Sequence, residues 1–349
     1  MIPEKMKALV VTAPETIEIC ELTTPIAESG EILVRLTHCL ICTWEQRVFS
    51  GNDVALPFVP GHEVSGEIAY IPEGTYTDLK VGQYCVVKTV DSCGRCEFCR
   101  LGRDNLCKSP SKKRFYDGIP GSGGMAQYIA IGADRVFALP KQEVDLSLAS
   151  FAEPLACCLH SIEQAKVSYG EDVVIVGGGI MGQLHAALVR LAGARAILVE
   201  PDAKRRQLAL DTGTHVVLDP INENVFEAIS DLTGGRGAHA VIFTVNNLEL
   251  AEQYIGALAA AGRLVYYGSF RPKGDIPVDP NHIHYSEKVL TGAYSPTVRA
   301  FWQAAQMLGN GLLDVTPYLS ESYDMNEAEK AFVRAGSMDT MRVQIRLTD

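Results

Sequence analysis

The chain has 349 residues, more than one hydrophobic core usually fills, so we expect two domains. Apolar residues make up 47% and charged residues 21%, and no apolar run approaches the roughly 20 residues that a membrane helix needs. The net charge of −11 argues against a nucleic-acid or anionic-membrane partner, because phosphate groups would repel most of such a surface.

Two features of the chain indicate its compartment and point to metal. The first residues, 1–7, lack the apolar segment of a signal peptide, so a cytoplasmic address is expected. Ten cysteines is a high count, and four of them fall between Cys93 and Cys107. Disulfides would be reduced in a cytosol, so this tight cluster indicates a metal site instead.

The first 150 residues or so alternate short apolar runs with glycine and proline, which is typical of a turn-rich antiparallel β domain. Strands are predicted at 7–12, 31–37, 64–71 and 83–88. Cys42 sits just after an apolar strand, and His62 and Glu63 lie in a Gly-His-Glu-Val-Ser-Gly motif. A lone cysteine is usually a small buried hydrophobe and a lone histidine a satisfied core group, so spacing alone does not bring these residues together.

The four clustered cysteines have the spacing C-x2-C-x2-C-x7-C, formed by Cys93, Cys96, Cys99 and Cys107. Four thiolates at this spacing can close tetrahedrally around Zn²⁺ and leave no open position for water. Arginines and a lysine flank them and offset the excess negative charge. An iron–sulfur cluster also uses four cysteines, but no other electron-transfer feature accompanies this stretch. We therefore predict a structural zinc lobe at about 91–110.

From about 155 to 295 the pattern changes to alternating strands and helices, which fits a parallel doubly wound sheet. Glu153 lies immediately before this region. The first strand, 173–176, is a continuous apolar run, as expected for a strand buried on both faces. A helical pattern follows at 180–191, and further strands are predicted at 196–199, 215–218, 240–244 and 263–267.

The run Gly177-Gly178-Gly179-Ile180-Met181-Gly182 follows the first of these strands and opens the helix, so it matches G-x-G-x-x-G in the context that gives the motif meaning. The helix N-terminus offers unpaired N–H groups to a pyrophosphate. Glu200 ends the next strand, where an acid would hydrogen-bond the ribose and repel a 2′-phosphate, which favours NAD over NADP. Arg205 lies nearby, where it could neutralise a phosphate or stack on adenine.

The tail contains a predicted helix at 298–308 and a strand at 341–347. The nucleotide-type region is thus predicted to be inserted before the last segment of the β domain. The expected domains are 1–155 together with 296–349, and 156–295.

Taken together, these motifs resemble the zinc-containing medium-chain dehydrogenase/reductase superfamily, in particular its sorbitol and threonine dehydrogenase-like branch. The similarity covers the whole chain and rests on the Cys42 segment, G-H-E-x-x-G, the four-cysteine lobe, Ala-Glu-Pro-Leu at 152–155, G-x-G-x-x-G and Glu200, all in family order. It implies an α/β protein with a GroES-like β-rich catalytic domain and a Rossmann NAD-binding domain, with the active site in the cleft between them.

The resemblance also implies a second, catalytic zinc. Cys42, His62 and Glu63 match its ligands, and Glu153 matches a carboxylate that either ligates the metal or holds its water. Such a zinc keeps a position for a substrate oxygen and, as a Lewis acid, assists hydride transfer from the carbinol carbon to nicotinamide. The nicotinamide pocket is expected to be lined by the loops after Thr244 and Gly268 and by the stretch that ends at Ser295.

The segment after Cys42 departs from the family pattern, which continues with glycine, a hydroxyl residue, aspartate and often a nearby histidine. Here the hydroxyl either moves one place early, to Thr43, or is replaced by Trp44, and Arg47 occupies the histidine position. The usual proton relay is therefore in question. Arg47 suggests a substrate with an anionic group or several oxygens, and an exposed salt bridge is the alternative.

The leading hypothesis is a zinc-dependent polyol, sugar-alcohol or cyclitol dehydrogenase with two zinc ions and NAD, a small-molecule alcohol or ketone substrate, and a homo-oligomeric state. A threonine-type amino-alcohol dehydrogenase is the alternative within the enzyme class. From other classes, a non-catalytic NAD-binding protein would have kept the fold without turnover, and a zinc-ribbon nucleic-acid binder would need a basic face. The intact ligand set and the acidic charge, respectively, argue against these two.

Overall fold

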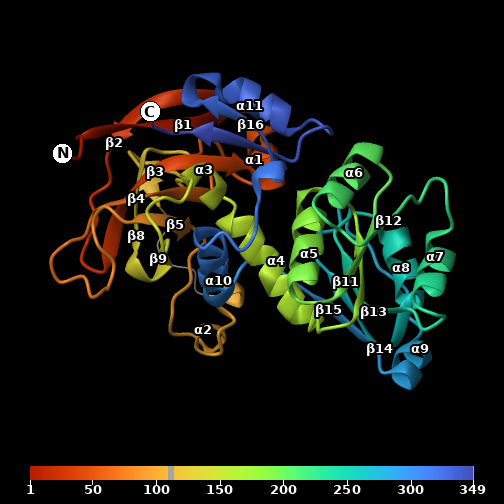
Figure 1. Ribbon diagram of the computed structural model, residues 1–349. Coiled ribbons are helices and arrows are strands. Elements are labelled where there is room, and N and C mark those ends of the chain that lie inside the picture. Colours follow the sequence, from red (N-terminus) through yellow and green to blue (C-terminus); the bar gives the residue numbers. More distant parts are fainter. Residues whose placement is uncertain (109–113, 349) are drawn as a thin grey trace. The chain divides into compact units, whose positions relative to one another are not determined.

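A computed structural model describes residues 1–108 and 114–348 (Figure 1). Residues 109–110 of the predicted zinc lobe and residue 349 lie outside the described part. The chain divides into two compact units, Met1–Ala156 with Thr297–Asp349, and Cys157–Pro296. The boundaries expected from the sequence each lie one residue earlier. Helix α4 (Ala152–Ala165) contains the first boundary.

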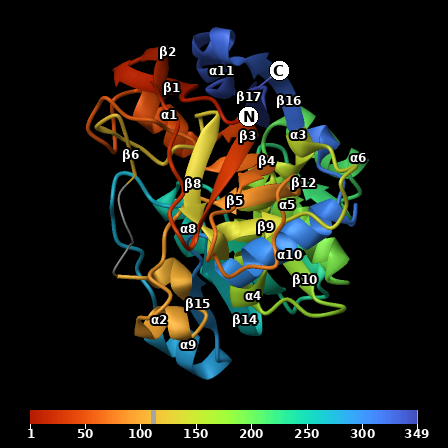
Figure 2. The same ribbon diagram turned by 90° about the vertical axis from the view of Figure 1, so that its left-hand side faces the viewer.

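The first unit is built mainly on a seven-stranded sheet. Its strands run in the order β16-β17-β3-β4-β5-β9, and β8 pairs with β3 (Figure 2). A separate pair is formed by β1 and β2. The elements are β1 (Lys5–Ala13), β2 (Thr16–Thr23), β3 (Glu31–Ile41), α1 (Thr43–Phe49), β4 (Glu63–Tyr70), β5 (Tyr84–Lys88), α2 (Glu97–Arg100), β6 (Phe115–Tyr116), β7 (Ile119–Pro120), β8 (Tyr128–Gly132), β9 (Val136–Ala138), α3 (Leu146–Ala149), α10 (Val298–Gly309), β16 (Leu319–Asp324), α11 (Ala328–Ala335) and β17 (Arg342–Arg346).

Strand β3 explains how this unit forms its core. Ile32, Val34 and Leu36 alternate along the strand, so period-two spacing points all three toward one apolar cluster. The pairing with β4 shifts register between Leu36 and His38, and this irregularity lets Cys39 and Ile41 join the same cluster. The sheet therefore keeps one buried face up to the residue that precedes Cys42.

The second unit is a six-stranded parallel sheet in the order β12-β11-β10-β13-β14-β15, with helices between the strands. This is the doubly wound strand order of dinucleotide-binding domains. Its elements are β10 (Asp172–Val176), α5 (Ile180–Leu191), β11 (Arg195–Val199), α6 (Ala203–Asp211), β12 (Val216–Leu218), α7 (Val225–Leu232), β13 (Ala238–Phe243), α8 (Leu248–Gly256), β14 (Leu258–Tyr266), α9 (Pro280–Ser286) and β15 (Val289–Gly292).

Both faces of this sheet are buried, which explains the continuous apolar runs in its strands. Val173 and Ile175 of β10 join one core cluster, to which α5 contributes Ala186 and Val189. The alternate residues of β10, Val174 and Val176, join the cluster on the opposite face with residues of α7 and α8. Figure 1 shows α5 on one side of these strands and α7 and α8 on the other.

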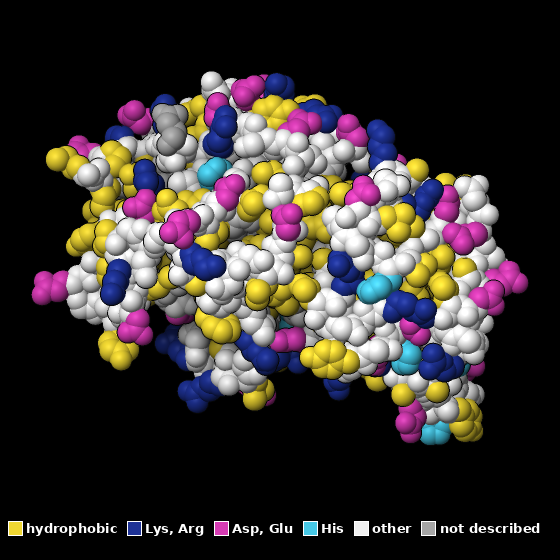
Figure 3. Space-filling model, viewed as in Figure 1, with side chains coloured by type: hydrophobic (Ala, Val, Ile, Leu, Met, Phe, Trp, Pro, Cys, Tyr) yellow, Lys and Arg dark blue, Asp and Glu magenta, His cyan; other side chains and the backbone are white. Residues whose placement is uncertain are grey.

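The surface mixes charges of both signs. On the face drawn in Figure 3, acidic and basic side chains are interspersed rather than gathered by sign. Among the described residues, no helix combines the length and apolar character required to cross a membrane.

Candidate metal and cofactor sites

The register of two strands brings Cys42 and His62 together. Leu40 near the end of β3 pairs with Glu63 at the start of β4, so the residues just beyond these positions meet at the same edge. Cys42 begins helix α1 as its N-cap, and its sulfur accepts the backbone N–H of Trp44 at 3.2 Å. The sulfur lies 3.6 Å from Nε2 of His62.

Glu45 fixes the orientation of His62. Its carboxylate accepts a hydrogen bond from Nδ1 of His62 at 2.5 Å and another from the backbone N–H of Cys42 at 3.2 Å. Glu45 is fully buried, and burial raises its pKa; the charge of His62 and the hydrogen bonds from His62 and Cys42 together outweigh burial, so the pKa is lowered overall. Because Nδ1–H of the neutral imidazole donates to Glu45, the lone pair lies on Nε2, where a metal can bind.

Sequence reasoning did not assign this role to Glu45. The available signal was its position three residues after Cys42, where the family pattern has aspartate. A glutamate keeps the carboxylate with one more methylene, and it also completes a capping box on α1.

Two further carboxylates lie at the cluster. Glu63 is buried and forms a two-point ion pair with Arg342 of β17, at 2.7 and 3.0 Å. Burial raises the pKa of Glu63 to about 7, with Arg342 opposing the rise and the nearby charge of Glu153 adding to it. Glu153 lies in the first turn of α4 and is only 9% exposed. Ligand atoms of Cys42, His62 and Glu63 all lie within 4.8 Å of one another, whereas Glu153 is not part of that group.

The donor set fits a divalent cation. Tetrahedral zinc with one sulfur and one nitrogen ligand places these two atoms roughly 3.5 Å apart, close to the separation of Cys42 and His62. Burial raises the pKa of the Cys42 thiol to about 11, so the thiolate needs a nearby positive charge. Three buried carboxylates share the region with Arg342, which leaves negative charge for a metal to neutralise.

The second candidate site is the four-cysteine lobe around α2. Its sulfurs lie 3.5 to 4.0 Å apart for the pairs Cys96–Cys99, Cys96–Cys107 and Cys93–Cys99, and none of them is in a disulfide. Zinc held by four thiolates sets sulfur separations of roughly 3.8 Å, so the lobe has the size of a closed zinc site. Backbone N–H groups of Arg95 and Cys96 lower the pKa of Cys93 to about 6, which favours the thiolate.

The glycine motif has the shape of a phosphate cradle. Gly177 has a φ of +98° and Gly182 packs against its carbonyl, where a Cβ would come within 1.8 Å. At Gly179 a Cβ would meet no atom within 4 Å, so space is open where the backbone was predicted to approach a pyrophosphate. Gly179 is the N-cap of α5, and Ile180 and Met181 form its first turn.

Glu200 lies against this motif. Its carboxylate accepts the backbone N–H of Gly178 at 2.5 Å and that of Asp202 at 2.8 Å, and the residue is only 4% exposed. Arg205 lies in the following helix, α6, where its backbone N–H is capped by Asp202 and its carbonyl accepts from Gln183. The acid that was predicted to bind the ribose is therefore held beside the loop that was predicted to bind the pyrophosphate.

The weaker cofactor candidates occupy the carboxyl ends of later strands. Thr244 follows β13, and its hydroxyl donates to the carbonyl of Val176 at 2.7 Å. Gly268 lies over this residue, since a Cβ there would come within 3.0 Å of the Thr244 carbonyl. Ser295 follows β15 with a φ of +57°. Their contact with nicotinamide stays a prediction.

The residues that depart from the family pattern lie along α1. Thr43 is the first residue of the helix and is exposed. Trp44 packs edge-on against Phe58 and against His62, with ring centroids 5.8 and 5.5 Å apart. Arg47 pairs with Asp53 at 2.5 Å, which matches the salt-bridge alternative. Roles of Thr43 and Arg47 in turnover stay predictions.

Comparison with known proteins identifies the family. Residues 28–141 match the domain family "Alcohol dehydrogenase GroES-like domain", and residues 181–310 match "Zinc-binding dehydrogenase". L-threonine 3-dehydrogenase of Pyrococcus furiosus is 30% identical, over 95% of this chain and 97% of that protein. The chain belongs to the zinc-containing medium-chain dehydrogenase/reductase superfamily.

Other relatives of this dehydrogenase extend the comparison. Erythritol/L-threitol dehydrogenase of Mycolicibacterium smegmatis is 27% identical, over 99% of this chain and 98% of that protein. The NADP-bound crystal structure of a zinc-binding dehydrogenase from Sinorhizobium meliloti has a TM-score of 0.89 and 27% identity, covering 99% of this chain and 100% of that one. The predicted GroES-like and Rossmann architecture is confirmed, and the dehydrogenase is a zinc-dependent alcohol oxidoreductase.

Proposed function

We propose that this dehydrogenase oxidises a secondary hydroxyl of a polyol, sugar alcohol or cyclitol with NAD as hydride acceptor, and reduces the matching ketone in the reverse direction. The observation that carries the proposal is the buried group of Cys42, His62 and Glu63, whose ligand atoms lie within 4.8 Å of one another. The relative named for erythritol and L-threitol supports a substrate with several hydroxyls.

Each residue of the cluster has a proposed task. Cys42, His62 and one of the carboxylates Glu63 and Glu153 hold zinc. When bound, zinc supplies Lewis acidity that favours loss of the substrate's hydroxyl proton. Glu45 directs Nε2 of His62 toward the cluster through its hydrogen bond to Nδ1.

Arg342 controls how much of the Glu63 charge is available. It occupies both carboxylate oxygens of Glu63, so Glu63 can bind a metal only by sharing or giving up this pair. Glu153 lies near enough to raise the pKa of Glu63 and can supply a carboxylate while the pair stays intact. We propose that these two acids share the role of third ligand.

The preference for NAD is proposed to rest on Glu200. Its carboxylate is buried beside the glycine motif, where it would accept hydrogen bonds from ribose hydroxyls and repel a 2′-phosphate. The NADP-bound relative from Sinorhizobium meliloti makes NADP the competing choice. The nicotinamide of the bound cofactor supplies the hydride acceptor.

Glu200→Ala tests the cofactor assignment. We expect the substitution to lower kcat/KM with NAD and raise it with NADP, because the ribose acceptor and the repulsive charge are both lost. Glu223→Ala, an exposed acid of the same unit, is the control and should leave the ratio unchanged. Preference of the wild type for NADP would show that the role given to Glu200 is wrong.

The substrate class is tested by a panel with NAD. Polyols and inositols should give the highest kcat/KM, and long apolar alcohols should be poor substrates. L-threonine is the second candidate, because relatives named L-threonine 3-dehydrogenase reach 30% identity. A kcat/KM for L-threonine well above that for every polyol would favour the hypothesis of an amino-alcohol dehydrogenase.

A homo-oligomer and a cytoplasmic location are also proposed. Strand β15 ends the parallel sheet, with Val289 48% exposed, so a second copy can extend the sheet there. All ten cysteines are unbridged, which suits a reducing compartment.

The oligomeric state is tested by light scattering after gel filtration, which should give the mass of a dimer or tetramer. Leu290→Pro, which removes a backbone donor from β15, should shift the measured mass toward that of a monomer.

A further inference from the structure

A basic recess lies at the amino ends of strands β10, β11 and β12, whereas the glycine motif follows the carboxyl end of β10. It has a volume of about 680 Å³, and its lining includes Asp172 and Arg195, the first residues of β10 and β11, and His215, which directly precedes β12. The glycine motif follows the other end of β10. A strand of this length spans roughly 16 Å, so the recess is distinct from the cofactor loop.

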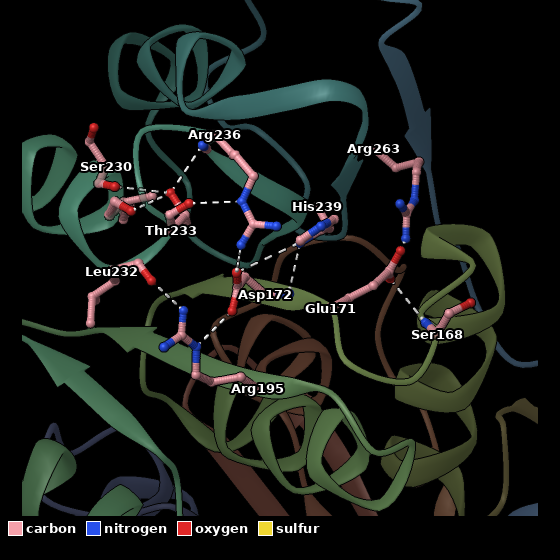
Figure 4. Close-up of polar contacts among 12 residues, drawn as sticks. Ser168, Glu171, Asp172, Arg195, Ser230, Leu232, Thr233, Arg236, His239 and Arg263 are labelled. Carbon is pink, nitrogen blue, oxygen red and sulfur yellow. Dashed lines mark hydrogen bonds and ion pairs between the residues drawn. The ribbon is translucent and has the colours of Figure 1, made fainter.

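Asp172 anchors two arginines of the recess. It accepts from Nε of Arg195 at 2.6 Å, and Nη2 of Arg236 lies 3.8 Å from its other oxygen. Arg195 also donates to the carbonyl of Leu232 at 2.5 Å, and Arg236 donates to that of Thr233 at 2.9 Å. Figure 4 shows the two guanidinium groups converging on Asp172 from different segments. The buried acid and the carbonyls hold both cations in place.

A third arginine and a histidine line the same recess. Nη1 of Arg190 donates to the carbonyl of Thr212 at 2.5 Å, and its guanidinium covers Gly213, where a Cβ would come within 2.8 Å of Cζ. Nδ1 of His215 accepts the backbone N–H of Ala196 at 3.1 Å. The neutral imidazole therefore carries its proton on Nε2, and this nitrogen is a donor.

These groups leave donors for an external acceptor. Among the described residues, no partner contacts Nη1 of Arg195, Nη1 of Arg236 or Nη2 of Arg190. Three arginines against one aspartate give the lining an excess of positive charge in a chain whose net charge is −11. Guanidinium groups held at fixed positions recognise phosphate oxygens well, because each offers several donors in one plane.

We propose that this recess binds the phosphate group of a phosphorylated small molecule, at a site separate from the cofactor motif. Donors from three segments, α5, the start of β11 and the loop before β13, surround the space, which suits a tetrahedral dianion that accepts in several directions. The remaining volume would take the organic part of the ligand. Asp172 faces the same space and acts through the two arginines that it positions.

Calorimetric titration with inorganic phosphate tests the proposal. The wild type should bind phosphate, and Arg236→Ala should weaken binding about tenfold or more, because it removes a charge-assisted donor. Arg236 is 67% exposed, so the variant should fold, and Arg190→Ala gives a second, independent variant. Arg346→Ala, which removes an arginine paired with Asp324 in the other unit, is the matched control and should bind like the wild type.

Two comparisons separate this site from others. Phosphate affinity should be the same in the presence of saturating NADH, which would fill the glycine motif. Malonate, a dianion whose oxygens belong to two planar carboxylates, should bind more weakly than phosphate. No phosphate binding by the wild type, equal loss in Arg346→Ala, or unchanged affinity in both Arg236→Ala and Arg190→Ala would overturn the proposal. Competition by NADH would assign the phosphate to the glycine motif, and tighter malonate binding would rule out the phosphate class.

Discussion

Glu45 contacts the candidate metal site of Cys42, His62 and Glu63 through a hydrogen bond to His62. It has no exposed surface, and its carboxylate contacts both the imidazole and the backbone of Cys42. A carboxylate in this position fixes the tautomer and the ring orientation of a histidine ligand and raises its basicity. One side chain therefore links the cap of helix α1 to the geometry of the site.

Glu45→Gln is expected to weaken zinc binding at the Cys42 cluster about tenfold to a hundredfold and to lower kcat/KM, because the amide is a weaker acceptor for Nδ1. Competition with a chelator measures the affinity. Glu67→Gln, at a glutamate of β4 that pairs with Arg35, is the control and should change neither quantity. Wild-type zinc affinity in Glu45→Gln would show that Glu45 only caps the helix.

Substitution of Arg47, unlike that of Glu45, is expected to have little effect on turnover. It pairs with Asp53, and the two side chains are 30% and 18% exposed, so the pair contributes about 0–1 kcal/mol. Arg47→Ala should therefore leave KM for the best polyol within about twofold of the wild type. An increase of ten to a hundred times, as expected for a lost charged hydrogen bond worth about 1.5–3 kcal/mol, would instead place Arg47 at the substrate.

At the scale of elements, the sequence pattern predicts best where burial is regular. Helix α5 runs from Ile180 to Leu191, as predicted, because it follows the glycine motif and packs along a regular apolar face. Strand β14 begins at Leu258, five residues before the predicted start. Ala261 there has a φ of +56° and the pairing shifts register, so the apolar pattern is broken.

Other features leave little signal in the sequence. Strand β2 is mostly exposed, and the alternation of Ile17, Glu18 and Ile19 is interrupted at Cys20, so pattern reasoning did not predict the strand. The pairing of Glu45 with His62 joins residues 17 positions apart, and that of Glu63 with Arg342 joins residues 279 apart. Such contacts depend on the register of β3, β4 and β17, which local sequence does not specify. The closely spaced cysteines and the glycine motif, by contrast, are local and were recognised.

Helix α5 also carries a pH-sensitive group. His185 is fully buried and donates from Nδ1 to the carbonyl of Met181 at 2.7 Å, and burial lowers its pKa to about 4. Between pH 6.5 and 4 the unfolded chain binds this proton and the folded chain does not. The stability that depends on the neutral histidine is therefore present above pH 6.5 and is lost as the pH falls toward 4. Over this range the free energy of unfolding falls by roughly 3 kcal/mol.

His185→Leu should remove this dependence. Free energies of unfolding measured between pH 7 and 4 should fall less steeply for the variant than for the wild type, whereas His284→Leu, at an exposed histidine, should follow the wild type. Parallel curves for the wild type and His185→Leu would show that another group controls acid stability.

At the scale of the whole molecule, two candidate metal sites lie in one unit and differ in kind. The lobe of four cysteines surrounds its centre with sulfur alone, whereas the cluster at Cys42 combines a thiol, an imidazole and carboxylates. A closed site of four thiolates stabilises the fold, and an open mixed site can admit a substrate oxygen. The second unit carries the glycine motif on a parallel sheet, so the candidate metal sites and the candidate cofactor motif belong to different units.

Zinc content and activity followed together during mild chelation test the zinc assignment most directly. We expect two zinc ions per chain, with loss of about one equivalent abolishing turnover while circular dichroism stays unchanged; Cys42→Ser should reproduce this state, and Cys96→Ser should mainly lower the melting temperature. Full activity after removal of the labile zinc, or release of both metals together with unfolding, would contradict a catalytic zinc at Cys42 and His62.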